Sequence, residues 1–122
     1  NHTMHHLQGM KVNSYRYMHD ITEANDLIGS SLFRPPHGLI RWKQARAIKD
    51  HYNIVMYDLV TRDYSKKMTP EKVFANVRRY ARNGSIIVFH DSLKAEKNMK
   101  TALPLAIEWL QARGYNFGRL GD

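Results

Sequence analysis

Apolar residues recur along this chain with two alternating periods, one typical of amphipathic helices and one typical of buried strands. The helical period predicts helices over residues 13–28, 40–52, 69–83 and 98–113. Between and after them, short apolar runs predict strands over residues 31–34, 54–60, 85–90 and 115–120. This alternation predicts an α/β fold, arranged as a barrel or as a doubly wound sheet.

Residues that favour helix ends support these boundaries. Asn13 is a suitable N-cap for the first helix and Gly29 a suitable stop, while Thr69 precedes a proline, Pro70, at the first position of another helix. The apolar faces expected to point inward are Tyr17, Ile21, Ala24 and Ile28 on the first helix and Val73, Phe74, Val77 and Tyr80 on the third. These positions form the predicted core of the two helices.

The composition fits a single globular domain, because the chain has 122 residues of which 43% are hydrophobic. Its first six residues have no feature of a translation start or of a secretion signal, so we expect further residues upstream of Asn1. The longest apolar run, residues 86–89, is far shorter than the ~20 residues that cross a bilayer, and it predicts no transmembrane segment in this stretch. Because the chain has no cysteine, any metal ligands must be His, Asp or Glu.

The formal net charge of +8 could attract nucleic acid or an anionic polymer. The basic residues are scattered, however, and only Arg78, Arg79 and Arg82 gather on one predicted helix. Aromatic residues are not interleaved with them as in single-strand binding proteins. We therefore expect an ordinary solvated helix face and no nucleic-acid partner.

Histidines near the start of the chain form the first candidate site. His2 and His6 are four residues apart, so a helical turn or a tight loop can direct both imidazoles at one ion. Taken alone, this pattern could also be an affinity-tag remnant or an incidental His-rich start, since His5 lies between them.

Further candidates follow the predicted strands. In the segment 33–38, two prolines fix the backbone after a strand, an arginine projects from it, and a glycine permits a close approach. Taken singly, this segment could be a structural turn. Likewise, the pair Asp63-Tyr64 could be loop residues, and the pair His90-Asp91 a satisfied histidine with a helix cap.

Together and in this order, the motifs resemble those of the polysaccharide deacetylase family, carbohydrate esterase family 4. His2-Thr3-Met4-His5-His6 resembles the family's His-Ser/Thr-x-x-His metal motif, and Arg34-Pro35-Pro36-His37-Gly38 its Arg-x-Pro-Tyr/x-Gly motif. Val88-Phe89-His90 resembles the hydrophobic-x-His motif, and Asp63-Tyr64 stands where the family has Asp-Trp. The resemblance implies an α/β fold that is part of a distorted (β/α) barrel missing its N-terminal strands, with residues 1–122 as an N-terminally truncated deacetylase domain.

The chain departs from the family in two places. The first motif of the family, a Thr-Phe-Asp-Asp-like segment that supplies the general base and a third metal ligand, would precede Asn1. We therefore expect the fragment itself to be inactive. In addition, His37 replaces the usual tyrosine, which need not remove a role for its backbone N–H in an oxyanion hole.

The resemblance also implies roles for individual residues. A divalent metal, with zinc as the first choice, would be bound by His2 and His6, while His5 would point away. The catalytic residues would be His90 as general acid, Asp63 as its partner, and Arg34, which would orient the base. Residues that contact the substrate would be Pro36, His37, Gly38, Tyr64 and Val88, the last of these lining the pocket for the acetyl methyl group.

The implied activity is removal of acetyl groups, foremost N-acetyl groups, from a polysaccharide or from the glycan of peptidoglycan. The partner would be an acetylated carbohydrate polymer, and the location secreted, periplasmic or in the cell envelope. One alternative is a non-catalytic carbohydrate-binding or cell-envelope module with the same fold, which metal binding would distinguish. A weaker alternative is a basic nucleic-acid module, whose DNA affinity would fall steeply with salt.

Overall fold

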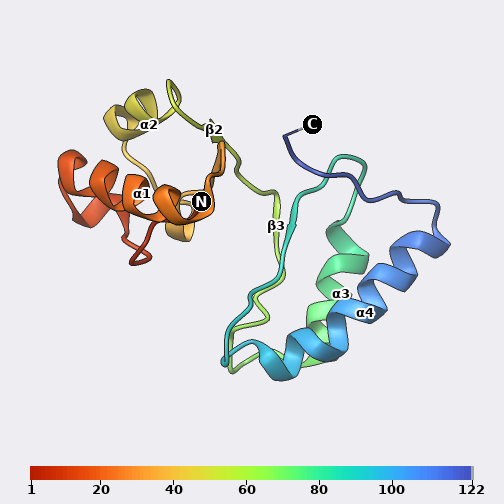
Figure 1. Cartoon of the computed structure of the whole chain (residues 1–122). Coiled ribbons are helices and arrows are strands. Elements are labelled where there is room, and N and C mark those ends of the chain that lie inside the picture. Colours follow the sequence, from red (N-terminus) through yellow and green to blue (C-terminus); the bar gives the residue numbers. More distant parts are fainter. Residues whose placement is uncertain (122) are drawn as a thin grey trace. The chain divides into compact units, whose positions relative to one another are not determined.

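The chain divides into two units, each containing a two-stranded parallel sheet (Figure 1). The computed structural model describes residues 1–121. The first unit comprises Asn1–Met56 and the last residues from Arg119, and the second comprises Tyr57–Gly118. This division places the predicted histidine and Arg34 motifs in one unit and the Asp63 and His90 motifs in the other.

The first unit is built from two helices and one parallel ladder. Helix α1 (Ser14–Ile28) begins where the Asn13 side chain accepts the Arg16 N–H at 2.8 Å, and it ends at Gly29, whose φ of 59° closes the helix. Strand β1 (Leu32–Phe33) pairs with β2 (Asn53–Ile54), and helix α2 (Trp42–Ile48) connects them. Short 3₁₀ turns lie at Gly9–Lys11 and Pro36–Gly38. The ends of α1 are therefore those that its local sequence predicts.

Apolar side chains from both helices and β1 form the core of this unit. Its buried members are Tyr17, Ile21, Phe33 and Ile48. A buried polar residue, Gln44, ties α2 to the N-terminal turn, since its amide donates to the Gly9 carbonyl at 2.9 Å and its oxygen accepts the Arg41 N–H at 3.0 Å. Both polar atoms of this buried amide are thus satisfied.

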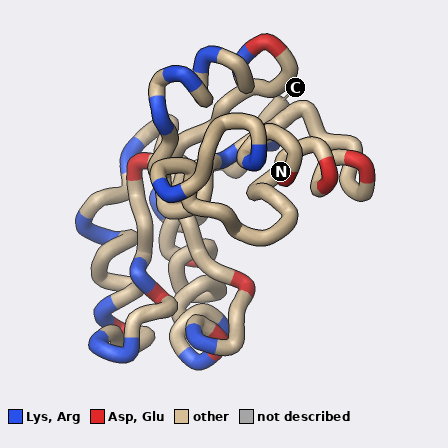
Figure 2. Tube along the Cα trace, turned by 90° about the vertical axis from the view of Figure 1, so that its left-hand side faces the viewer, with Lys and Arg blue, Asp and Glu red and all other residues tan. Residues whose placement is uncertain are grey.

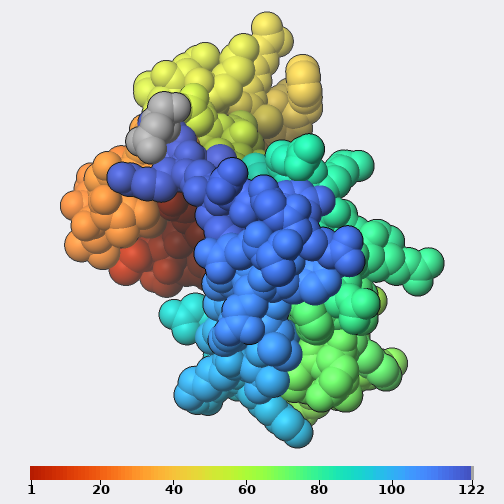
Figure 3. Space-filling view, turned by 90° about the vertical axis from the view of Figure 1, so that its right-hand side faces the viewer, coloured from red at the N-terminus to blue at the C-terminus, as the bar shows by residue number. Residues whose placement is uncertain are grey.

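The second unit contains the other ladder and two long helices. Strand β3 (Leu59–Val60) pairs in parallel with β4 (Ile87–Val88). Helix α3 (Pro70–Tyr80) begins at Thr69, and α4 (Glu96–Ala112) lies along it, as Figure 3 shows. The core between these helices is formed by Val77, Ala106 and Leu110, with Phe74 and Trp109 in edge-to-face contact beside it. These contacts bury the apolar face of α3.

The predicted α/β class and the four predicted helices are confirmed, whereas the single strand over 54–60 is wrong. The segment forms two separate strands, β2 and β3, because the chain passes from the first unit to the second at Met56–Tyr57. Just after this point, Asp58 accepts the Ser85 hydroxyl at 2.9 Å and the Ile86 N–H at 2.8 Å. The Asp58 carboxylate therefore takes the backbone N–H that a longer β3–β4 ladder would use at this end.

Other predicted boundaries were too long. Helix α2 ends at Ile48. Strand β4 comprises only Ile87 and Val88, and both residues are half-buried because, among the described residues, β4 has a neighbouring strand on one side only. No strand forms over residues 115–120. Ile28 and Tyr80 are 55% and 53% exposed rather than buried, because each lies in the last turn of its helix, beyond the packed core. That these elements are part of a distorted (β/α) barrel stays a prediction, because the described strands form two separate two-stranded sheets.

Basic residues are spread along the trace, as expected (Figure 2). Those of the predicted cluster make local contacts: Arg82 pairs with Asp58 at 3.3 Å, and Arg78 lies over the Phe74 ring. Within residues 1–121, no helix combines the length and apolar character that a membrane span requires.

The two isoleucines of α1 provide a matched test of this core. Replacing the fully buried Ile21 with Ala should lower the free energy of unfolding by about 2–5 kcal/mol, because it leaves a cavity. Replacing Ile28, exposed on the same helix, should cost about 0.5 kcal/mol or less. Chemical denaturation of both variants measures the difference, and equal costs would contradict the described core.

Candidate functional site

The histidines of the first unit lie in a row of ring contacts. The ring centroids of His2 and His6 are 5.0 Å apart, and those of His6 and His37 are 4.9 Å apart, both pairs meeting edge to face. Nδ1 of His2 lies 2.6 Å from the Arg34 carbonyl oxygen. Because a carbonyl only accepts, Nδ1 must carry the ring proton, which leaves Nε2 of His2 with a free lone pair.

This arrangement fits a divalent ion at His2 and His6. Burial lowers the pKa of His2 below 6.5, outweighing the Arg34 carbonyl, which raises it. The ring is therefore neutral near pH 7, as a metal ligand must be. A backbone carbonyl that fixes the tautomer of a histidine is also a usual partner of metal-binding imidazoles.

The backbone around these histidines is constrained. Thr3, His6 and His37 have φ values of 62°, 53° and 59°, in the left-handed region that non-glycine residues rarely adopt. His37 follows two buried prolines, and the turn closes where the Gly38 N–H donates to the Pro35 carbonyl at 3.0 Å. The side chain of His37 is exposed, so the turn presents it at the surface.

Arg34 follows β1 and is anchored to the strand beside it. Its Nε donates to the Val55 carbonyl at 3.1 Å, at the end of β2. The same residue thus provides a carbonyl for His2 and a guanidinium held at the strand end.

Asp63 and His90 form a close pair in the second unit. Asp63 is fully buried, and its two oxygens accept the His90 N–H at 2.7 Å and the His90 Nδ1 at 2.6 Å. The Tyr64 ring lies 4.7 Å from the His90 ring, edge to face. These residues follow the ends of the parallel strands β3 and β4, where Val88 is half-buried. With Nδ1 bound, the Nε2 of His90 is the nitrogen left for chemistry.

Polar residues that the sequence analysis missed hold the Asp63 loop. Asn98, buried on α4, donates to the Asp63 carbonyl at 2.8 Å, and Asn76 on α3 donates to the Thr61 carbonyl at 3.3 Å. The Thr61 hydroxyl donates to the Val88 carbonyl at 2.8 Å. The available signal for Asn98 was a polar residue in line with the apolar positions of the buried face of α4, Ala102, Ala106 and Leu110.

A second His–Asp pair, also missed, lies beside the histidine row. Asp20 on α1 is buried, and its oxygens accept the His5 N–H at 3.0 Å and the His5 Nδ1 at 2.6 Å. His5 and Asp20, with Glu23, form a group of potential metal-binding side chains. The ring of His5 is thus held by α1.

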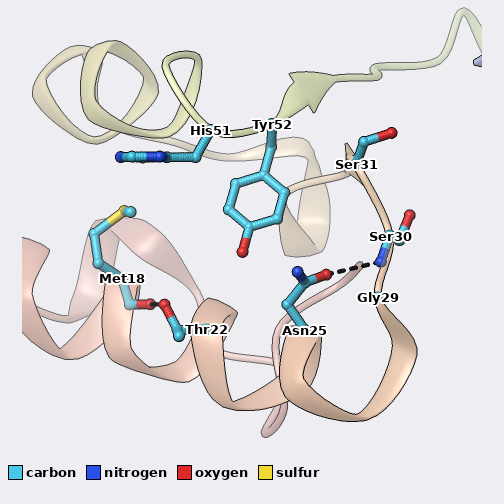
Figure 4. Close-up of a pocket in the computed structure, with 8 residues that line it drawn as sticks. All are labelled: Met18, Thr22, Asn25, Gly29, Ser30, Ser31, His51 and Tyr52. Carbon is cyan, nitrogen blue, oxygen red and sulfur yellow. Dashed lines mark hydrogen bonds between the residues drawn. The ribbon is translucent and has the colours of Figure 1, made fainter.

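Within the described residues, the structure contains two cavities, one in each unit. One of about 570 Å³ is lined by Met18, Thr22, Asn25, Gly29, Ser30, Ser31, His51 and Tyr52, and by none of the predicted site residues (Figure 4). The other, of about 370 Å³, is lined by Asp91, Ser92, Leu93, Glu96, Met99 and Lys100. The lining of the second cavity therefore includes Asp91, the residue directly after His90.

The two histidines with resolved pKa shifts should titrate in a fixed order. The hydrogen bond to Asp20, followed by the charge of that carboxylate, raises the pKa of His5 above 6.5, whereas burial lowers the pKa of His2. As pH rises, His2 should therefore lose its proton before His5, and Asp20→Asn should bring the pKa of His5 down. NMR titration of the ring protons measures both values, and a His5 that titrates before His2 would contradict this geometry.

Neither a protein-family model nor a curated protein matches the sequence. Solved structures do match. The Bc1960 peptidoglycan N-acetylglucosamine deacetylase has a TM-score of 0.90 at 25% identity, covering 98% of this chain and 59% of that one. A family 4 carbohydrate esterase from Streptomyces lividans, in complex with acetate, has a TM-score of 0.86 at 21% identity, covering 99% and 64%.

A third structural neighbour is BA3943 from Bacillus anthracis, a CE4 family pseudoenzyme, with a TM-score of 0.86 at 23% identity, covering 98% of this chain and 43% of that one. This chain thus spans less than two thirds of the length of each of these proteins. The resemblance that the motifs predicted is confirmed at the level of structure: over nearly its whole length, the chain has the fold of carbohydrate esterase family 4 deacetylases.

Proposed function

We propose that the protein containing this chain is a metal-dependent hydrolase that removes acetyl groups, foremost N-acetyl groups, from a polysaccharide or from the glycan of peptidoglycan. The observation that carries this proposal is the Asp63–His90 pair at the ends of two parallel strands. A peptidoglycan N-acetylglucosamine deacetylase among the structural neighbours supports the substrate class.

His2 and His6 would bind the metal, zinc being the first choice, because their rings lie close together and Nε2 of His2 is available. When bound, such an ion polarises the acetyl carbonyl and lowers the pKa of water toward ~7. The Arg34 carbonyl keeps His2 in the tautomer that this role needs.

His90 would act as the general acid. The His90 Nδ1–H donates to Oδ1 of Asp63, with 2.6 Å between the two heavy atoms. The other ring nitrogen, Nε2, therefore points away from Asp63 and would carry the proton that is transferred. Water adds its oxygen to the acetyl carbon, the carbon–nitrogen bond breaks, and the Nε2 proton of His90 passes to the departing amine nitrogen. The Asp63 carboxylate, fully buried, keeps the His90 ring in the orientation that this transfer needs.

Other residues of the motifs would contact the substrate or position the base. The His37 N–H is the proposed donor to the oxyanion, and Pro36 and Gly38 shape the turn that carries it. Arg34, held at the end of β2, would orient the general base, the carboxylate of the family's first motif that is expected upstream of Asn1 and that would take the proton of the water. Tyr64 and Val88 would line the acetyl pocket beside His90.

A second candidate function is a non-catalytic carbohydrate-binding module of the cell envelope. It is favoured by one observation, that a protein described as a CE4 family pseudoenzyme shares this fold at a TM-score of 0.86. Such a module would bind acetylated glycan without releasing acetate. Acetate release by the protein that contains the chain, with N-acetylated chito-oligosaccharide as substrate, distinguishes the two functions.

Substitution of His90 tests the proposed general acid. In the full protein, His90→Ala should lower kcat by about 10²- to 10⁴-fold while leaving metal content and substrate binding nearly unchanged, because a general acid acts in the transition state. His2→Ala should lose activity through metal affinity and recover part of it in excess zinc. Acetate release across a range of zinc concentrations measures both effects.

His51→Ala is the matched control, because His51 is an exposed histidine outside all the motifs. It should retain the turnover of the unmodified protein. If His90→Ala also retains it, the proton must come from another group and the role assigned to His90 is wrong.

A further inference from the structure

The segment that carries His2 and His6 is strained but firmly held. Thr3 and His6 both adopt left-handed backbone conformations, with φ of 62° and 53°. Non-glycine residues keep such conformations only where the surroundings over-determine them. Some contact outside the segment must therefore hold it in the conformation that brings the two rings together.

Asp20 supplies the contacts at the middle of the segment. Its carboxylate accepts the backbone N–H of His5 at 3.0 Å and the ring Nδ1 of His5 at 2.6 Å. Its own backbone carbonyl accepts the Met4 N–H at 3.2 Å. One residue of α1 thus makes three hydrogen bonds to Met4 and His5, which lie between the two candidate ligands.

The environment of Asp20 makes these bonds strong constraints. The side chain is 7% exposed, so its oxygens depend on donors from the protein rather than on water. Asp20 also lies in the middle of α1, next to the core residue Ile21, so its position is fixed by the helix and its packing. Asp20 is therefore held in place by α1 and contacts the histidine segment through His5.

We propose that Asp20 is a positioning residue for the candidate metal centre, acting through His5 to hold His2 and His6 at the separation that one ion requires. The inference rests on the proposed metal site and adds a residue outside the family motifs. Glu23 does not share the role, because it is exposed on the next turn of α1. Both oxygens of Asp20 already accept from His5, so Asp20 holds the loop rather than binding an ion.

Zinc affinity of the chain tests this role without any activity assay. Zinc is titrated in competition with a chromophoric chelator into the unmodified chain, Asp20→Ala, Glu23→Ala and a variant with both His2→Ala and His6→Ala. Asp20→Ala should weaken zinc binding by about 10-fold, at the low end of the effect of outer-shell partners on metal affinity. Glu23→Ala, the matched control on the same helix, should leave the affinity unchanged.

A spectrum separates positioning from coordination. At saturating cobalt, the visible absorption of Asp20→Ala should equal that of the unmodified chain, because the ligands are the same and only their preorganisation is lost. If Asp20→Ala fails to fold, as judged by its thermal unfolding, His5→Ala replaces it. That variant keeps the helix intact, removes a ring that is 62% exposed, and should weaken zinc binding in the same direction.

The outcomes are distinct for the two claims. Zinc binding that persists in the variant lacking His2 and His6 would overturn the proposed metal site, and the role of Asp20 with it. Binding that depends on those histidines but is as tight in folded Asp20→Ala, or in His5→Ala, would overturn the role of Asp20 alone. A second zinc ion lost in both Asp20→Ala and Glu23→Ala would show that Asp20 is a ligand and would also overturn the inference.

Discussion

A buried carboxylate that accepts from both the backbone N–H and the ring Nδ1 of one histidine determines the geometry of both halves of this chain. Asp63 holds His90 in this way, and Asp20 holds His5. Because each carboxylate is buried, both of its oxygens need donors, and a histidine satisfies them together. The arrangement fixes the ring tautomer and directs Nε2 away from the carboxylate.

The parallel ladders determine where Arg34, Asp63 and His90 lie. Each ladder is only two residues long, yet it aligns its two parallel strands, so the residues that follow these strands lie at the same edge of that sheet. Arg34 follows β1, while Asp63 and His90 follow β3 and β4. Helices α3 and α4 then hold the Asp63 loop through Asn76 and Asn98. The chemistry of the proposed site therefore depends on polar contacts from helices as much as on the strands.

Local sequence signals predicted well those features that local contacts determine. Asn13 and Gly29 predicted the limits of α1 because a cap and a left-handed stop act within a few residues. The break between β2 and β3 could not be predicted, since it depends on where the chain changes units. The roles of Asp20 and Asn98 were missed for a similar reason, because an Asp or Asn on a helix becomes an anchor only through a tertiary partner. The motif residues were predicted by family resemblance, which carries information that periodicity lacks.

We propose that the protein containing this chain uses a metal held by His2 and His6 to deacetylate a glycan. Acetate release from N-acetylated chito-oligosaccharide, measured before and after chelation and after return of zinc, tests it most directly. Acetate release is expected to stop when the metal is removed and to resume when zinc is restored. Release that continues at the same rate in the metal-free protein, or its absence from protein whose His2 and His6 demonstrably bind zinc, would contradict the account.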